Sequence, residues 1–144
     1  MPAALEDIGH LIQLAIAPVF LLTAIGTVLN VLAGRLGRAV DRRRVLAGRL
    51  SGLDEGAAGL ARAELDYQIR RIGLIYVAIQ MAVLSALLTC MLIALAFIDA
   101  FTAVDLAKLI ATLFILAMVA LIASLTIFLR EIFLAVSGPR APVL

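Results

Sequence analysis

The side chains that enzymes use for covalent or metal chemistry are scarce in this sequence. It has one histidine, His10, and one cysteine, Cys90. A hydrolytic or transfer reaction needs a nucleophile beside a base, and a zinc site needs several Cys, His or acidic ligands. A lone cysteine also cannot form an internal disulfide. We therefore expect no catalytic residues, no bound metal and no cofactor, and we do not expect an enzyme.

A set of polar and small residues is spaced so that it falls on one face of a helix. At about 100° per residue, this face holds Thr23, Gly26, Thr27, Asn30, Gly34, Gly37 and Asp41. Such residues in a membrane helix face protein or water rather than lipid. Either the face packs against another helix, with hydrogen bonds from Asn30 and the threonines, or it lines a pore formed by several copies.

A proline, Pro18, lies in the same segment as this polar face. Proline removes one backbone hydrogen bond and bends a helix, although membrane helices tolerate it. The bend is either a structural kink or a hinge for gating, which makes Pro18 the candidate hinge.

Arginines form the third group, and they follow the polar face along the chain. They are Arg35, Arg38, Arg42, Arg43, Arg44 and Arg49. Near a membrane surface, each basic residue contributes about 1 kcal/mol of attraction to anionic lipids. These arginines therefore contact anionic headgroups or, alternatively, a protein or anion partner. Nucleic acid is not expected, because no aromatic platform accompanies the arginines.

The elements that position these residues follow from composition. Hydrophobic residues make up 65% of the 144 residues and charged residues only 15%, whereas soluble domains are about half apolar and a quarter charged. Three segments carry no charge, at 8–34, 72–98 and 109–129. Each has at least 21 residues, and about 20 suffice to cross a bilayer as a helix.

These segments predict an all-α integral membrane protein with three transmembrane helices. We expect spans at about 8–34, 72–98 and 107–130, with Asp105 capping the third, in a single membrane domain over residues 1–144. A short tail begins at Ser137-Gly138-Pro139, which stops the last helix.

Orientation follows from the distribution of Lys and Arg, which are concentrated in cytoplasmic loops. The stretch 35–71 holds nine arginines and five acids, whereas 99–108 holds one lysine and two acids. The first residues carry Glu6 and Asp7 and no basic residue. We therefore expect the N-terminus outside, the 35–71 stretch in the cytoplasm and the C-terminus inside.

The cytoplasmic stretch has the pattern of a helical hairpin. No proline interrupts 35–50, and most of its residues favour helix. The glycine-containing stretch 51–56 predicts a turn with Asp54 as a helix cap. The return helix is expected from about Ala57 into the second span. The first two membrane helices thus extend into a hairpin over 35–71.

Small residues predict where the second and third spans pack. They recur on one side of each span, as Ala78, Ala82, Ser85 and Thr89 in the second and Ala117, Ala120, Ala123 and Ser124 in the third. Small residues at helical spacing permit close approach of two helices. Cys90 is expected to be a small buried apolar residue beside them.

Several blocks resemble one known family. They are Ile12 to Thr23, Gly26, Leu29 to Leu32, Arg35-Leu36 and Val40 to Arg42, then Glu64-Leu65, Arg70 to Ile72, Ser85 to Leu88 with Cys90, and Phe128 to Ile132. Together they resemble a family of small bacterial membrane proteins known only as a domain of unknown function. The resemblance covers most of the chain. It implies a multi-pass protein of the bacterial inner membrane and supplies no activity.

Two functions are compatible with these features. The first is a non-enzymatic scaffold or interaction protein, whose basic hairpin meets lipid headgroups or a cytoplasmic partner. The alternative is a homo-oligomeric ion channel, with the polar face of the first helix lining the pore. A homo-oligomer is expected, and a pore would need several copies because three helices are too few to enclose a water-filled path.

Overall fold

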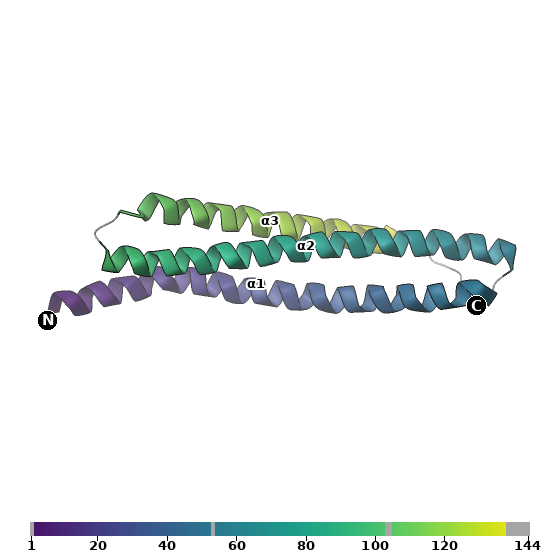
Figure 1. Ribbon diagram of the computed structural model, residues 1–144, viewed down its shortest axis with the longest axis horizontal. Helices are drawn as coiled ribbons and strands as arrows, with labels where there is room; N and C mark the ends of the chain where they lie inside the picture. Colours follow the sequence, from purple (N-terminus) through teal and green to yellow (C-terminus); the bar gives the residue numbers. More distant parts are fainter. Residues whose placement is uncertain (1, 53, 103–104, 138–144) are drawn as a thin grey trace. The chain divides into compact units, whose positions relative to one another are not determined.

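The computed structural model describes residues 2–52, 54–102 and 105–137, and the regular structure in these residues is helical. Helix α1 covers Pro2–Arg49, a 3-10 turn covers Leu50–Gly52, α2 covers Glu55–Phe101 and α3 covers Ala107–Ser137 (Figure 1). Each α-helix is long and apolar enough to cross a membrane. The chain is therefore an all-α, multi-pass membrane protein, which confirms the predicted fold.

The turn between α1 and α2 has the predicted cap. The Oδ1 atom of Asp54 accepts the backbone N–H of Glu55 at 3.0 Å, and its carbonyl accepts the N–H of Ala58 at 2.8 Å. The bond to Glu55 satisfies a donor that the first helical turn leaves open, and the bond to Ala58 is the first backbone bond of the helix. Helix α2 therefore begins at Glu55, two residues before the predicted Ala57, and continues into the second apolar segment.

The start of α3 is held by two carboxylates. Asp105 Oδ1 accepts the N–H of Ala107 at 3.1 Å, as expected for its capping role. Asp99, near the end of α2, accepts the N–H of Leu106 at 2.8 Å, which ties the two helices together across the loop. Helix α3 ends at Ser137, where the stop was predicted. The predicted tail beyond it lies outside the described residues.

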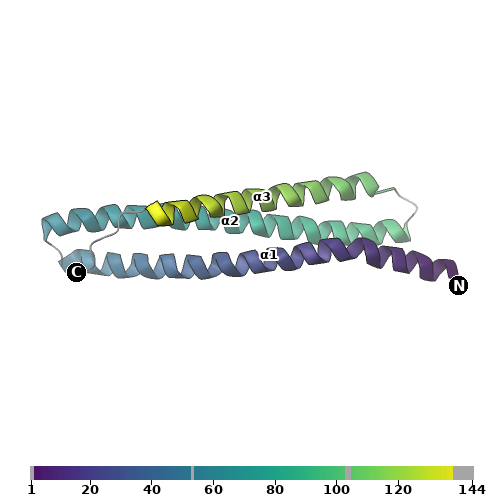
Figure 2. The same ribbon diagram turned by 180° about the vertical axis from the view of Figure 1, so that it is seen from behind.

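The described residues divide into two compact units, and each helix contributes to both. The first unit lies within Met1–Leu29 and Met81–Ala123, and the second within Asn30–Gln80 and Ser124–Leu144. Within each unit, segments of α1, α2 and α3 lie side by side in both views (Figures 1 and 2). The single membrane domain stays a prediction.

Each unit has its own core on the inward side of its helices. In the first unit, Ile25 of α1, Ala82 of α2 and Leu121 of α3 pack together. In the second unit the buried apolar side chains are Leu32, Ala39, Ile72, Ile75 and Ala78. The alanines let the helix backbones approach closely, which is how membrane helices gain packing energy without a hydrophobic driving force between them.

Helices α2 and α3 are also joined by buried hydroxyl groups. In the first unit Ser85 donates to the carbonyl of Ala117, and in the second unit Ser124 donates to the carbonyl of Ala78, each at 2.7 Å. The small residues predicted at this contact are buried or half-buried. One neighbouring prediction is wrong, because Cys90 is exposed. It follows the buried Thr89 by one position, and a step of about 100° turns it away from the contact.

Large apolar side chains cover the outside of all three helices. Examples that are more than half exposed are Phe20, Leu87, Ile115 and Phe133. Soluble monomers rarely expose contiguous apolar surface of this extent. Lipid is therefore the solvent of these outer faces.

The hydroxyl of Ser85 provides the first prediction. The variant Ser85→Ala removes a buried bond between α2 and α3, and such bonds in membrane proteins contribute about 0.6 kcal/mol on average and about 1.7 at most. We expect a loss of this size in the free energy of unfolding, measured by denaturant titration in micelles. Leu87→Ala, at a position 61% exposed, is the control for a substitution outside the contact, and an unchanged free energy of unfolding in Ser85→Ala would show that the bond contributes nothing.

Candidate functional site

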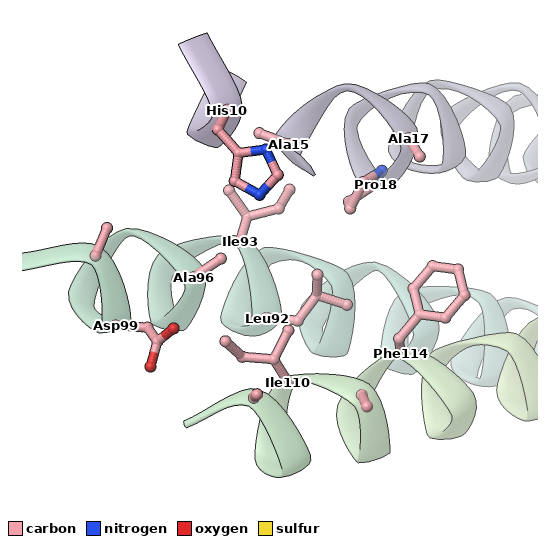
Figure 3. Close-up of a pocket in the computed structure, with 13 residues that line it drawn as sticks. His10, Ala15, Ala17, Pro18, Leu92, Ile93, Ala96, Asp99, Ile110 and Phe114 are labelled. Carbon is pink, nitrogen blue, oxygen red and sulfur yellow. The ribbon is translucent and has the colours of Figure 1, made fainter. Parts of the chain in front are cut away.

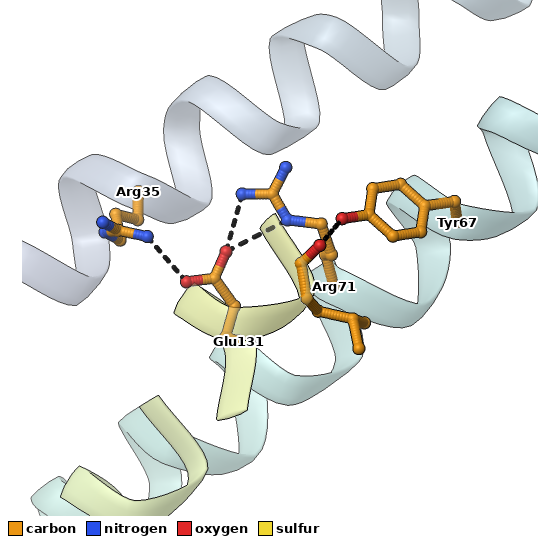
Figure 4. Close-up of polar contacts among 5 residues, drawn as sticks. Arg35, Tyr67, Arg71 and Glu131 are labelled. Carbon is orange, nitrogen blue, oxygen red and sulfur yellow. Dashed lines mark hydrogen bonds and ion pairs between the residues drawn. The ribbon is translucent and has the colours of Figure 1, made fainter. Parts of the chain in front are cut away.

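A carboxylate with no exposed surface lies at the centre of the second unit. Glu131 of α3 accepts a hydrogen bond from Nη1 of Arg35 on α1 at 2.8 Å. Its other oxygen accepts two bonds from Arg71 on α2, from Nε at 3.1 Å and from Nη2 at 2.7 Å (Figure 4). The side chain of Glu131 is 0% exposed, and those of Arg35 and Arg71 are 30% and 20% exposed. We call these three residues the charged cluster.

The charged cluster forms where the three apolar segments end. Arg35 directly follows the first charge-free segment, Arg71 directly precedes the second, and Glu131 lies two residues beyond the third. The three residues are far apart in sequence, and the alternating direction of the helices brings these ends together within one unit. One contact therefore joins all three helices.

Aromatic rings support both guanidinium groups. Arg35 lies over the ring of Phe128 with 5.2 Å from Cζ to the ring centroid, and Arg71 lies 5.9 Å from the centroid of Tyr67. The hydroxyl of Tyr67 donates to the carbonyl of Leu134. That carbonyl belongs to the last turn of α3, where no helical N–H follows to bond it. Tyr67 therefore ties α2 to the end of α3 beside the cluster.

The cluster has the chemistry of a structural clamp. A buried carboxylate is unfavourable unless it is paired and hydrogen-bonded, and here both oxygens accept charge-assisted bonds. The described residues contain no group of three or more His, Cys, Asp or Glu that could hold a metal ion. Two arginines against one glutamate leave a net positive charge on two side chains that are partly exposed.

A second buried polar group lies on the same helix as Arg71. Gln68 is 6% exposed, and its Oε1 atom has no hydrogen-bond partner among the described residues. A buried acceptor of this kind is unfavourable by about 1–3 kcal/mol if nothing satisfies it. A lone glutamine on a charged amphipathic helix normally faces water, so the sequence carries no signal for the burial of Gln68.

The hairpin is braced by a further ion pair between its two arms. Nη2 and Nε of Arg42 donate to the same oxygen of Glu64, at 2.7 and 3.2 Å. The Arg42 side chain is 57% exposed, so water screens this pair far more than it screens the charged cluster. Arg35 and Arg42, both predicted to contact lipid or a partner, thus have carboxylate partners within the chain.

The other predicted arginines, Arg38, Arg43, Arg44 and Arg49, are all exposed. Within residues 2–52, 54–102 and 105–137, no ion pair reaches any of the four. Their contact with lipid or a partner stays a prediction.

The predicted polar face of α1 points away from the rest of the subunit. In the first unit Thr23 and Thr27 are exposed, and their hydroxyls donate to carbonyls of α1 itself, those of Val19 and Thr23. In the second unit Asn30 and Asp41 are exposed. The described residues leave this face uncovered, so a packing role requires a helix from outside the subunit.

Pro18 lies within α1 and is buried in the first unit. It borders an apolar cavity of about 590 Å³ (Figure 3). His10 and Asp99 lie at one end of the cavity, and Phe114 lies near Pro18 at the other. The alanines and isoleucines that line the rest suit a hydrocarbon chain rather than a polar ligand. The hinge role of Pro18 stays a prediction.

Glu131 is the site residue that the sequence analysis missed. Its neighbour Arg130 is exposed, whereas Glu131 is buried. The sequence held one signal for its role. Glu131 is an acid beside the end of an apolar segment, and the arginines Arg35 and Arg71 lie beside the ends of the other two. A carboxylate at a basic membrane boundary has arginine partners within reach if the helices pack together.

One family profile matches residues 15–140, and the family is described as "Protein of unknown function (DUF2721)". No curated protein and no solved structure matches the sequence. The matched residues include the charged cluster, the polar face and Pro18. The resemblance to a domain of unknown function is confirmed, and the description of the family adds no activity.

The charged cluster predicts a large stability effect at Glu131. The variant Glu131→Gln keeps the shape of the side chain but leaves two guanidinium groups without their anion. Breaking a buried ion pair from one side costs about 3–5 kcal/mol. We expect the free energy of unfolding to fall by an amount at the lower end of this range. Both arginines are partly exposed and can turn toward water.

The matched control for this prediction is Glu64→Gln. It makes the same chemical change at the exposed pair with Arg42, where we expect a loss of at most about 1 kcal/mol. Chemical denaturation of both variants in the same micelles compares the two sites. Equal losses would contradict the role of the cluster as the contact that holds the three helices.

Proposed function

We propose that this chain, which belongs to the DUF2721 family of proteins of unknown function, is a non-enzymatic membrane scaffold whose basic hairpin binds an acidic partner. The observation that carries the proposal is the set of exposed arginines on the α1 arm of the hairpin. We place the protein in the bacterial inner membrane, with its N-terminus outside and the hairpin and C-terminus in the cytoplasm. The excess of arginine in 35–71 supports this orientation.

Positive charge is concentrated on one arm of the hairpin. The α1 arm, 35–49, has six arginines and one aspartate, whereas 54–71 has three arginines and four acids. Glu131 and Glu64 bind Arg35 and Arg42 of the α1 arm. The remaining arginines present a basic surface that attracts anionic groups and speeds their association.

The distance from the membrane favours a protein partner over lipid headgroups for the far end of this arm. Arg43 and Arg49 lie eight and fourteen residues beyond Arg35, which ends the apolar segment. At 1.5 Å per residue, this is roughly 12 and 21 Å along the helix. The headgroup layer is only about 5–7 Å thick on each side. Arg38 lies at headgroup depth, whereas Arg43 and Arg49 extend past it into the cytoplasm.

The ion pairs of the hairpin support a role in presentation. The Arg42–Glu64 pair joins the two arms, and the charged cluster fixes their base against α3. A braced arm loses little conformational entropy when a partner binds, and this favours affinity. Charged groups held in place also discriminate better between partners than mobile ones.

The geometry supports the channel alternative less than it supports the scaffold. The hydroxyls of Thr23 and Thr27 donate to their own helix, so they leave lone pairs for a cation but no donor for an anion. Asn30 is then the main polar group that this face could present to a pore. Ion flux through purified protein in liposomes, altered by Asn30→Leu, would favour the channel over the scaffold.

The test of the proposal is recovery of a partner after crosslinking in membranes. The charge reversal Arg43→Glu with Arg49→Glu should lower recovery by about tenfold, because each contact changes from attraction to repulsion. The matched control is Arg62→Glu with Arg70→Glu, which makes the same change at two exposed arginines of the α2 arm. Equal recovery of the partner by the two double variants would contradict the proposal. It would also be contradicted if Arg43→Glu with Arg49→Glu lost bound anionic lipid but still recovered the protein partner.

A further inference from the structure

The outer face of α1 in the second unit carries polar and small residues at helical spacing. We call this set the outer stripe, and it consists of Asn30, Gly34, Gly37, Asp41 and Arg44. All five are exposed. Leu32 and Ala39, on the opposite face of the same helix, are buried. One side of α1 thus packs inside the subunit, while the other is chemically unlike the apolar surface that lipid favours.

The glycines of the outer stripe have no role inside the subunit. A Cβ atom at Gly37 would meet nothing within 4 Å, and one at Gly34 would meet only the end of the Arg38 side chain at 3.7 Å. Neither has a positive φ, so the backbone does not require glycine. In a helix, glycine is less favourable than alanine by about 1 kcal/mol. Both glycines leave this face of α1 open to the close approach of another helix.

Asn30 is a second and independent reason to expect another chain at this face. It precedes the end of the apolar segment at Gly34 by four residues, roughly 6 Å of helix. No hydrogen bond reaches its side-chain amide from the described residues, although the amide has two donors and one acceptor. Lipid cannot satisfy these groups. The amide therefore needs a polar partner from another chain.

The charges at the far end of the stripe complement each other. Asp41 and Arg44 are three residues apart on the same face, and no ion pair among residues 2–52, 54–102 and 105–137 includes either. Copies in one membrane share an orientation, so two α1 helices meet in parallel. A two-fold axis along the membrane normal then places Asp41 and Arg44 of one copy beside the same two residues of the other, and the long arginine side chain lets Arg44 of each copy reach Asp41 of its partner. The same symmetry brings the two Asn30 amides together.

We propose that the occupant of the outer stripe is a second copy of this chain, which docks through the same face of its own α1. The two helices cross at Gly34 and Gly37, with an Asn30–Asn30 hydrogen bond inside the membrane. Two reciprocal Asp41–Arg44 pairs form beyond it. The contact uses neither Arg43 nor Arg49, so it stands or falls independently of the proposed partner of the hairpin.

Helix α2 has an outward polar set of its own, Gly73, Tyr76 and Gln80, all exposed. A head-to-tail arrangement would place the outer stripe of one copy against this set on the next. The isologous contact is favoured because it places glycines on both sides of the crossing and pairs both charges. The two arrangements differ in which residues meet, which makes them separable by crosslinking.

Disulfide crosslinking in native membranes tests the contact directly. In a Cys90→Ala background, Gly37→Cys should form a disulfide-linked dimer under mild oxidation, since its counterpart is adjacent. Val31→Cys is the matched control, because Val31 is 46% exposed on the same helix but off the stripe. It should give at least about tenfold less dimer, because disulfides form only when the two Cα atoms come within about 7 Å.

A charge exchange tests the pairing. Asp41→Arg and Arg44→Asp should each weaken dimerisation by about tenfold, measured by energy transfer between labelled chains in bilayers, because like charges then face each other twice. The double variant Asp41→Arg with Arg44→Asp should restore the dimer. Both positions are exposed, so folding of the subunit should be unaffected.

Other outcomes would overturn the proposal. These are equal crosslinking at positions 31 and 37, crosslinking of position 37 only to a cysteine at 73, or no rescue by the double variant. Rapid labelling of Asn30→Cys by a water-soluble maleimide would also overturn it, because the face would then line water. A monomer at every protein-to-lipid ratio would have the same consequence.

Discussion

The contact between Glu131 and the two arginines constrains the whole second unit. Three helices that meet in lipid have little hydrophobic reason to choose one register over another. A buried carboxylate removes that freedom, because any shift along a helix axis leaves it without Arg35 or Arg71. The hairpin arms then start from a fixed base, with the Arg42–Glu64 pair joining them farther out. The cluster therefore decides where the exposed arginines point.

The two faces of α1 divide the roles of the helix. Its inner face supplies Ile25 to the core of the first unit and Leu32 and Ala39 to the core of the second. Its outer face presents Asn30 and the glycines, which contribute nothing inside the subunit. In the proposed dimer, a second chain makes use of residues that lower the stability of an isolated helix. Scaffolding and self-association are compatible, because a dimer presents two basic arms on the same side of the membrane.

The apolar segments, the helix caps and the hairpin were predictable from the residues. Charge-free runs at 8–34, 72–98 and 109–129 allow only helices in lipid, because each backbone polar group must be satisfied within its own segment. Asp54 and Asp105 cap helices as local rules indicate. The exposure of Cys90 was not predictable, since one position along a helix separates it from the buried Thr89. Sequence spacing defines faces but does not say which face turns inward.

The sequence by itself determined that the chain crosses a membrane with three helices and places its arginines beside the ends of the apolar segments. Only the tertiary structure decided that Glu131 is buried between Arg35 and Arg71 and that Asn30 faces away from the subunit. The physical reason is the range of the interactions involved. Helix formation and capping depend on neighbours within a few residues, whereas an ion pair across 96 or 60 residues depends on how the helices rotate against each other.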